Sequence, residues 1–319
     1  YFLIKILMKL YLVIILIIIL ILFIYSIKIE QFITNNINFI KKTNVRDIIL
    51  KSDYFNNFTS IDLKLRNIDS NIKEFYFNNV LNYNQEEKNA LTWIIEQINI
   101  KDSFMDEDWN FVKFSDLENN FPHTHLKYIF LSQKQVDDIV YNYRKKSKIS
   151  GMRYLINTII DEKVHVYQRL YPEKFDELYK LWNFSKPKNI YNIEKFKHLV
   201  RNNPDSDKSY YVYSFDDTHI LMNALYNSDA KNIGDTKYIG LYLDKIDDNT
   251  YINKTNIVKE LKNIQEYNYL FGNISQNYYH PNEISAELIA AYYMEKLNNS
   301  FNQNSRAYNL LKNWINFNI

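Results

Sequence analysis

Apolar residues recur every three or four positions along much of this chain, which is the spacing that places them on one face of a helix. This pattern predicts helices at 85–100, 133–146, 152–170, 172–182, 282–297 and 305–315. Other stretches alternate or are rich in β-branched and aromatic residues, and they predict strands at 109–115, 126–132, 210–215, 219–226 and 237–243. Helices and strands interspersed in this way indicate an α+β fold.

The amino-terminal part of the chain has neither pattern. Residues 10–27 are uncharged and almost wholly apolar, a run long enough to cross a bilayer as one helix. The run exceeds the ~7–15 residues of a usual signal-peptide core and no small-residue cleavage site follows it. We therefore expect an uncleaved transmembrane signal anchor over residues 1–29. Lys5 and Lys9 precede the apolar run, so we expect a single-pass membrane protein whose remaining residues lie on the non-cytosolic side.

The rest of the chain divides by the strength of its patterns. Residues 30–70 are polar, rich in Asn and poorly patterned, so we expect a stalk or irregular segment there. Residues 71–319 hold the regular patterns and are expected to form the folded domain. No linker rich in Pro or Gly, and no repeat, divides this region further.

Composition limits the chemistry that this domain can perform. The net charge of +2 indicates no polyanionic partner, so we expect no nucleic acid. The chain contains no cysteine, which excludes disulfides and Cys-based zinc sites. A bound metal would have to be held by His, Asp and Glu.

A polar group follows the apolar face of the helix expected at 152–170. Asp161 and His165 stand four positions apart, so on a helix they point the same way, one turn above the other. Glu162 completes the order D-E-x-x-H. This group is consistent with a buried catalytic helix, and equally with the exposed end of an ordinary amphipathic helix.

A second polar pair lies in the helix expected at 282–297. Glu283 and Glu287 are also four apart, in the sequence N-E-I-S-A-E. This stretch resembles the N-E-x-x-[SA]-[DE] signature of the gluzincin metallopeptidases, the thermolysin-like class of zincins. In that class the first Glu is a zinc ligand, and the second acid orients the first His of the H-E-x-x-H motif from behind.

The wider context resembles predicted H-E-x-x-H metalloproteases of bacteria and large DNA viruses. The resemblance covers about residues 120–300, and its single outstanding departure is Asp161 in place of the first His. The matching pieces, in the order of that family, are F-P-H-T at 121–124, H-V-Y-Q-R at 165–169, Pro172, Phe175, Leu178 and Tyr179, N-P-D at 203–205, and H-P-N-E at 280–283 with Ala286 and Glu287.

The resemblance implies a zincin-like domain that binds Zn²⁺ and hydrolyses a peptide or protein substrate. Asp161, His165 and Glu283 would be the metal ligands, with Glu287 behind them. Glu162 would take a proton from the attacking water and pass it to the leaving amine. An edge strand above the metal would hold the substrate extended, and the strand at 126–132 is our candidate for it. No other cofactor is implied.

Asp161 changes what such a site can do. Its carboxylate is a legitimate zinc ligand, but with Glu283 it neutralises the ion and weakens its power as a Lewis acid. More oxygen ligands make Mn²⁺ or Fe²⁺ more competitive with Zn²⁺, and the site could also be empty of metal. A further His could complete it, and the candidates for this ligand are His123, His125 and His280.

Several other residues carry two interpretations. His280 either donates a hydrogen bond to the transition state, as a catalytic residue, or caps the helix with Asn282. Arg169 either pairs with Asp176 or Glu177 or has a structural role in the cleft. Tyr211, Tyr213 and His219 are candidates for an oxyanion stabiliser, and the alternative for each of them is a packing role.

Two functions compete with a membrane-anchored metallopeptidase. One is a catalytically inactive pseudo-peptidase that acts as a binding or virion-surface protein. The other is a structural membrane protein in which the motifs are coincidental.

Overall fold

The computed structural model describes residues 15, 17–18, 37–69, 71–98, 100, 102–206, 210–272, 277–297 and 304–319. The signal anchor expected over residues 1–29 falls almost wholly outside this part of the chain. Within it, no helix combines the length and the apolar character that a membrane crossing requires.

Helices and strands alternate through the described residues, which confirms the mixed α+β composition expected from the sequence. The helices are α2 (Lys42–Lys51), α3 (Ser60–Leu65), α4 (Ile72–Asn78), α5 (Gln85–Ile98), α6 (Gln133–Lys145), α7 (Arg153–Leu170), α8 (Pro172–Leu181), α9 (Glu194–Lys197), α10 (Gln265–Phe271), α11 (Pro281–Lys296) and α12 (Arg306–Asn318). The strands are β1 (Ile37–Phe39), β2 (Val80–Leu81), β3 (Trp109–Phe114), β4 (His123–His125), β5 (Tyr128–Ser132), β6 (Phe184–Ser185), β7 (Asn189–Tyr191), β8 (Val212–Phe215), β9 (Thr218–Tyr226), β10 (Thr236–Asp247), β11 (Thr250–Ile252) and β12 (Val258–Glu260).

The first sheet has the strand order β1-β3-β5-β4, with β2 paired to β3. Strands β1, β3 and β5 are parallel, whereas β4 runs antiparallel to β5. The edge strand is therefore β4, and our assignment of the edge to residues 126–132 is wrong. The chain folds back after β4 through Leu126, whose φ is 54°, so that β5 lies between β3 and β4.

Residues 37–69 belong to this same half of the fold, which corrects the expectation of an irregular segment at 30–70. Strand β1 pairs with β3, and helix α2 packs its apolar face on the sheet. The apolar positions are sparse among Asn and Lys, yet they converge in one cluster. Its buried members from this segment are Val45, Ile48, Ile49, Tyr54, Phe55 and Ile68.

A buried ion-pair network fixes this segment to the remainder of the chain. Arg66 donates to Asp62 Oδ1 at 2.9 Å and to both carboxylate oxygens of Glu118 at 3.0 Å. The hydroxyls of Tyr54 and Tyr76 also donate to Glu118. Burial favours protonation of Glu118, but Arg66 outweighs it and lowers the pKa of Glu118 to about 2.

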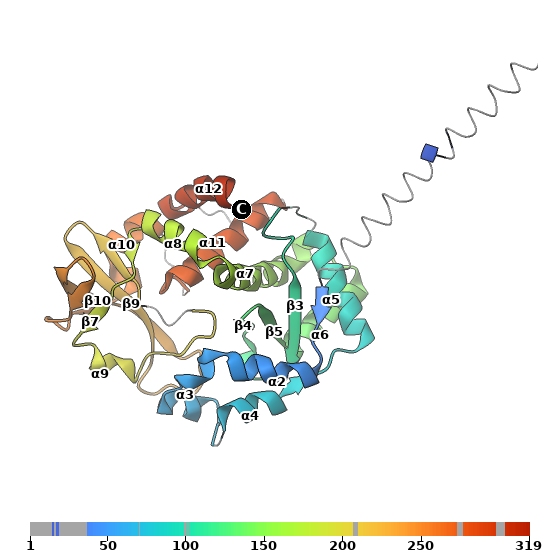
Figure 1. The fold of residues 1–319 in the computed structure, drawn as a ribbon, viewed down its shortest axis with the longest axis horizontal. Coiled ribbons are helices and arrows are strands. Elements are labelled where there is room, and N and C mark those ends of the chain that lie inside the picture. Colours follow the sequence, from blue (N-terminus) through green and yellow to red (C-terminus); the bar gives the residue numbers. More distant parts are fainter. Residues whose placement is uncertain are drawn as a thin grey trace, which may run out of the picture.

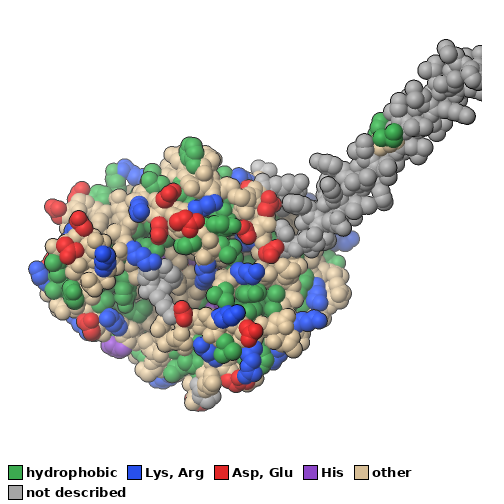
Figure 2. Space-filling model, viewed as in Figure 1, with side chains coloured by type: hydrophobic (Ala, Val, Ile, Leu, Met, Phe, Trp, Pro, Cys, Tyr) green, Lys and Arg blue, Asp and Glu red, His purple; other side chains and the backbone are tan. Residues whose placement is uncertain are grey.

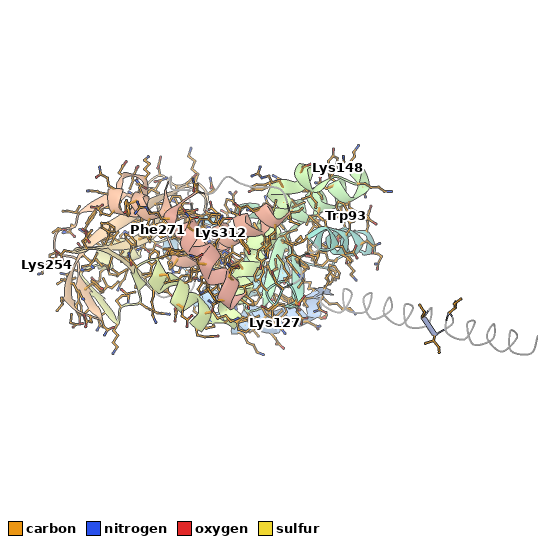
Figure 3. The ribbon with its side chains drawn as sticks, turned by 90° about the horizontal axis from the view of Figure 1, so that it is seen from above. Trp93, Lys127, Lys148, Lys254, Phe271 and Lys312 are labelled. Carbon is orange, nitrogen blue, oxygen red and sulfur yellow. The ribbon has the colours of Figure 1, made fainter. Side chains whose placement is uncertain are left out.

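The second sheet has the order β6-β8-β9-β10-β11-β7, with β12 also paired to β10. Its centre is the long antiparallel hairpin of β9 and β10. The two sheets lie on opposite sides of the molecule in Figure 1. Seen from above, Lys254 lies at the end formed by the second sheet, and Trp93 and Lys148 lie toward the other end (Figure 3).

Helix α7 runs through the middle of the molecule, between β4 and β5 on one side and α11 on the other (Figure 1). Its apolar residues, among them Ile156, Ile160 and Val164, enter the main core. Glu162 and His165 are buried on the same helix. Buried charged side chains are costly unless they are paired or serve a function, so this part of α7 is a candidate for a functional site.

A candidate metal centre between two buried helices

The carboxylates and the imidazole predicted as ligands lie close together, at the crossing of α7 and α11. His165 Nε2 is 3.6 Å from Asp161 Oδ2 and 4.0 Å from Glu283 Oε1. The side chains of His165, Asp161 and Glu283 are 2%, 24% and 11% exposed. Asp161 and His165 meet because one helical turn separates them, and Glu283 joins them because α11 packs along α7.

The imidazole of His165 is oriented by Gln168, one turn further along α7. His165 Nδ1 lies 3.0 Å from Gln168 Oε1. The Gln168 amide nitrogen donates to Asn282 O and to Ser285 Oγ, both at 2.8 Å, so its oxygen is left to accept from His165. This arrangement keeps a proton on Nδ1 and directs Nε2 toward the two carboxylates, which is the usual orientation of a metal-binding His.

The loop before β8 holds Glu283 from the opposite side. Asn203 Nδ2 donates to Glu283 Oε1 at 3.0 Å, and Ser206 Oγ lies 3.4 Å from the same oxygen. Asp205 in this loop accepts from the backbone N–H and the hydroxyl of Thr124 on β4, at 2.7 and 2.8 Å. The N-P-D turn therefore links the edge strand to the candidate ligand on α11.

Negative charge dominates this cavity, which has a volume of about 400 Å³. Five acidic side chains line it against His165 and Arg201, namely Asp161, Glu162, Asp205, Glu283 and Glu287. Glu287 thus lies on the wall where it was expected, although its predicted role behind the first ligand stays a prediction.

The pKa values reflect the excess of carboxylates. Burial opposes charge on His165, but the carboxylates of Glu283 and Asp161 outweigh it and raise its pKa to about 10. Burial also raises the pKa of Glu283 to about 7, against the partial opposition of His165. Burial, together with Asp205 and Asp161, raises the pKa of Glu162 well above its usual range. The site therefore favours a further positive charge.

Glu162 has one carboxylate oxygen without a protein partner. Its side chain is buried, and Oε2 has no hydrogen-bond partner among the described residues. Burying a carboxylate oxygen without a hydrogen-bond partner costs free energy, because the oxygen loses its hydrogen bonds to water and forms none within the protein. It lines the same cavity as Asp161, His165 and Glu283, so a ligand or water in the cavity can supply the missing partner.

His280 does not line this cavity. It is the N-cap of α11, and its Nδ1 accepts a hydrogen bond from the backbone N–H of Asn282 at 3.2 Å. Its ring lies edge-on to Tyr211. The helix-capping alternative thus matches the structure, whereas the catalytic assignment of His280 has no support in this geometry.

His123 and His125 are also excluded as additional ligands. Successive side chains of a strand point to opposite faces, so Thr124 faces α7 while both His side chains face away. They pack against Phe130, and neither lines the acidic cavity. His125 Nδ1 lies 3.1 Å from Ser52 Oγ.

The three candidate oxyanion stabilisers lie elsewhere as well. Tyr213 donates to the Glu266 carbonyl at 3.1 Å, and His219 Nδ1 lies 2.9 Å from Ser214 Oγ. Tyr211 lines a neighbouring cavity instead.

Arg201 and Tyr238 also line the acidic cavity, and neither was predicted from the sequence. No spacing pattern linked these residues to the motif helices, although Asp205 was visible within the N-P-D turn.

The ligand spacing is wider than that of a loaded site. Ligands about 2.0–2.1 Å from a tetrahedral zinc lie about 3.3 Å apart, compared with 3.6 and 4.0 Å here. Across the described ranges, no three His, Asp or Glu side chains are close enough to form a finished metal site.

Comparison with protein-family models, curated protein sequences and solved structures found no match for this chain. The geometry and chemistry of the cavity therefore carry the functional argument.

Proposed function

We propose that this chain is a zincin-like metallopeptidase that hydrolyses peptide bonds with a water activated by a divalent metal. The observation that carries the proposal is the convergence of Asp161 and His165 from α7 with Glu283 from α11, beside Glu162, whose Oε2 has no hydrogen-bond partner among the described residues. Helices distant in the sequence would not present three metal-ligand side chains to one cavity for packing reasons alone.

The fold supports this proposal. The motif helix α7 lies under a mixed sheet whose edge strand β4 runs antiparallel to its neighbour. The F-P-H-T, N-P-D and H-P-N-E pieces of the resemblance meet around one cavity, since Phe121, Asn203 and Glu283 all line it. This is the arrangement that the resemblance to gluzincin-type enzymes implies.

The residues present fit a divalent cation. Asp161, His165 and Glu283 would hold it, and His165 Nε2, directed toward both carboxylates by Gln168, would bind it in place of its proton. A bound divalent metal lowers the pKa of a water molecule and polarises a substrate carbonyl. Two carboxylate ligands make Mn²⁺ or Fe²⁺ competitive with Zn²⁺ at this site.

Glu162 is the proposed general base. Its buried position and raised pKa make it able to take a proton from water and release it to the departing amine. Proton transfer of this kind contributes about 10²–10⁴-fold to a rate. Glu287, from the same cavity wall, is proposed to position the ligand side chains.

The substrate cannot bind simply as an extra strand along the edge strand β4. The backbone N–H of Thr124 on β4 is already donated to Asp205, and its carbonyl accepts from Arg169 at 3.4 Å. A peptide cannot add to β4 at this residue while the loop of Asp205 stays in place. The peptide or protein substrate is therefore proposed to enter from the adjoining cavity.

The membrane anchor over residues 1–29 remains part of the proposal.

An inactive pseudo-peptidase that acts as a binding or virion-surface protein is the second candidate. Two observations favour it, namely Asp161 in place of the first His and the covered backbone of Thr124.

One experiment separates the two candidates. The purified full chain is incubated with Zn²⁺, Mn²⁺ or Fe²⁺ and a mixed peptide library, and new peptide ends are identified by mass spectrometry. The enzyme proposal expects cleavage that chelator removes and that Glu162→Gln abolishes. Peptide binding without cleavage in every metal would favour the pseudo-peptidase.

A further inference from the structure

A second cavity of about 720 Å³ adjoins the acidic one. Its size lies within the range of ~300–1,000 Å³ typical of ligand pockets. Arg201 and Asn203 line both cavities, so these two residues lie between them. Figure 2 shows Lys and Arg side chains around the hollowed centre of this face, between the second sheet and helices α2–α4.

The second cavity has the opposite charge from the first. Its cationic side chains are Lys51, Arg169, Lys197 and Arg201, while Asp53 is its single acid among the described lining residues. Lys197 also contacts Glu194 at 3.3 Å near the surface. The floor is uncharged and includes Val200, Met222 and Ala224. An anionic group would therefore be drawn into this cavity and repelled from the acidic one.

Arg201 lies where the two cavities meet. Its backbone N–H donates to Ala224 O at 2.9 Å, which fixes the residue beside β9. Its Nε is enclosed and has no hydrogen-bond partner in the described part of the chain. The charge of Arg201 also interacts with Glu283 of the acidic cavity. A planar guanidinium can bind a carboxylate through two parallel hydrogen bonds.

We propose that the basic cavity binds a carboxylate of the peptide substrate, with Arg201 as its principal partner. This inference rests on the proposed function and names the substrate class, namely peptides that carry a carboxylate close to the scissile bond. The carboxylate comes either from the peptide's carboxyl terminus or from an Asp or Glu side chain. Arg201 also lines the acidic cavity, together with Glu162. A substrate carboxylate bound to Arg201 therefore places the neighbouring backbone of the peptide beside Glu162.

The test measures binding of fluorescent peptides to the full chain carrying Glu162→Gln, which prevents turnover. Four peptides of one length are compared, with a free or amidated carboxyl terminus and with an internal Glu or Gln. We expect at least about tenfold tighter binding of one carboxylate form than of its amide, as for hydrogen bonds between charged groups. The terminal and internal pairs show which source of carboxylate is used.

The same binding is measured with Arg201→Gln, which should remove the preference for the carboxylate. Lys254→Gln is the matched control, because Lys254 lies at the far end of the second sheet and should leave the preference intact (Figure 3). If Arg201→Gln does not fold, the double variant Lys51→Gln, Lys197→Gln replaces it and should weaken carboxylate binding several-fold.

Equal binding of acid and amide peptides overturns the inference, as does a carboxylate preference that survives Arg201→Gln. Competition by inorganic phosphate as strong as that of the unlabelled carboxylate peptide would also overturn it, because the cavity would then be a general anion site. Zinc binding is titrated in parallel in every variant. Absence of any carboxylate preference in the Glu162→Gln protein with zinc binding intact rejects this inference alone, whereas absent zinc binding in that protein rejects the proposed function.

Discussion

Nε2 of His165 lies 4.0 Å from Oε1 of Glu283, although the two residues belong to helices far apart in the sequence. Gln168 turns the imidazole toward this carboxylate, and Asn203 holds the carboxylate from behind. A cation placed between them would relieve the mutual repulsion of the surrounding acids. The proposed metal centre depends on this position of His165 relative to Glu283.

Replacing the proposed general base should separate catalysis from metal binding. Glu162→Gln removes the carboxylate that accepts the proton but retains the size of the side chain. We expect peptide cleavage to fall by about 10²–10⁴-fold while metal affinity stays similar. Cleavage rates and metal titrations of both proteins measure this. Undiminished cleavage would assign the base to another residue.

Gln168 is expected to act as a positioning residue for His165. Gln168→Leu removes the acceptor for His165 Nδ1, so the imidazole loses its fixed tautomer and orientation. Loss of such a partner typically costs about 10–100-fold in metal affinity. Titration with Zn²⁺ gives the measurement, and Gln85→Leu on the surface of α5 is the control. Unchanged affinity in Gln168→Leu with a normal melting temperature would contradict this role.

Restoring the first His of the motif should change the metal preference. Asp161→His replaces an oxygen ligand with a nitrogen ligand and removes one negative charge. Because imidazole favours Zn²⁺ over Mn²⁺ more than a carboxylate does, the ratio of zinc to manganese affinity should rise. Competitive titration of the two metals measures the ratio. A ratio that stays constant would mean that residue 161 does not contact the metal.

Helices α5, α6, α7, α8, α11 and α12 could be predicted because their apolar spacing is local. The motif residues on α7 and α11 were found in the same way, since four-residue spacing is visible without knowledge of tertiary contacts. The edge strand was assigned wrongly because strand order depends on pairing between distant segments. Arg201, which lines both cavities, was missed because it lies in a loop without any repeating pattern.

The expected stalk shows a second limit of the sequence. Its buried residues are few and widely spaced, so no window of the sequence shows a clear face. What fixes them is the network of Arg66 with Asp62 and Glu118, in which Glu118 lies 52 residues from Arg66 along the chain. The pair of Arg66 with Glu118 has no local signal, because these two residues become neighbours only after folding.

That network should be essential for stability. Glu118→Gln removes the charge that balances Arg66 and leaves a buried cation partly unpaired. Breaking a buried pair on one side typically costs about 3–5 kcal/mol in the free energy of unfolding. Urea denaturation followed by circular dichroism measures the loss. Glu74→Gln breaks the exposed pair with Arg46 and is the control, for which little change is expected.

The buried histidines of β4 should make a contribution to stability that is lost in mild acid. Burial, together with His123 and Arg169, holds the pKa of His125 well below its usual value, and burial likewise lowers the pKa of His123. These two histidines bind more protons in the unfolded chain, so their contribution to stability is full above pH ~6.5 and falls as the pH drops below it. The slope is up to about 1.4 kcal/mol per pH unit for each histidine.

Thermal melting of the wild type and of His125→Phe between pH 8 and pH 5 tests this pH dependence. Phenylalanine keeps an aromatic ring beside Phe130 but cannot take up a proton. We expect a smaller fall in melting temperature for the variant over this range. Parallel curves for the two proteins would contradict the assignment to His125.

The central claim is tested most directly by counting metal ions on the full chain, purified in detergent and dialysed against micromolar zinc. We predict about one zinc per chain, lost in the double variant His165→Ala, Glu283→Ala and retained in the surface variant Glu260→Gln. A tetrahedral site with three protein ligands binds one metal ion, so one zinc per chain is the expected ratio. No bound zinc, manganese or iron in the wild-type protein, or the same amount in the double variant, would contradict the account.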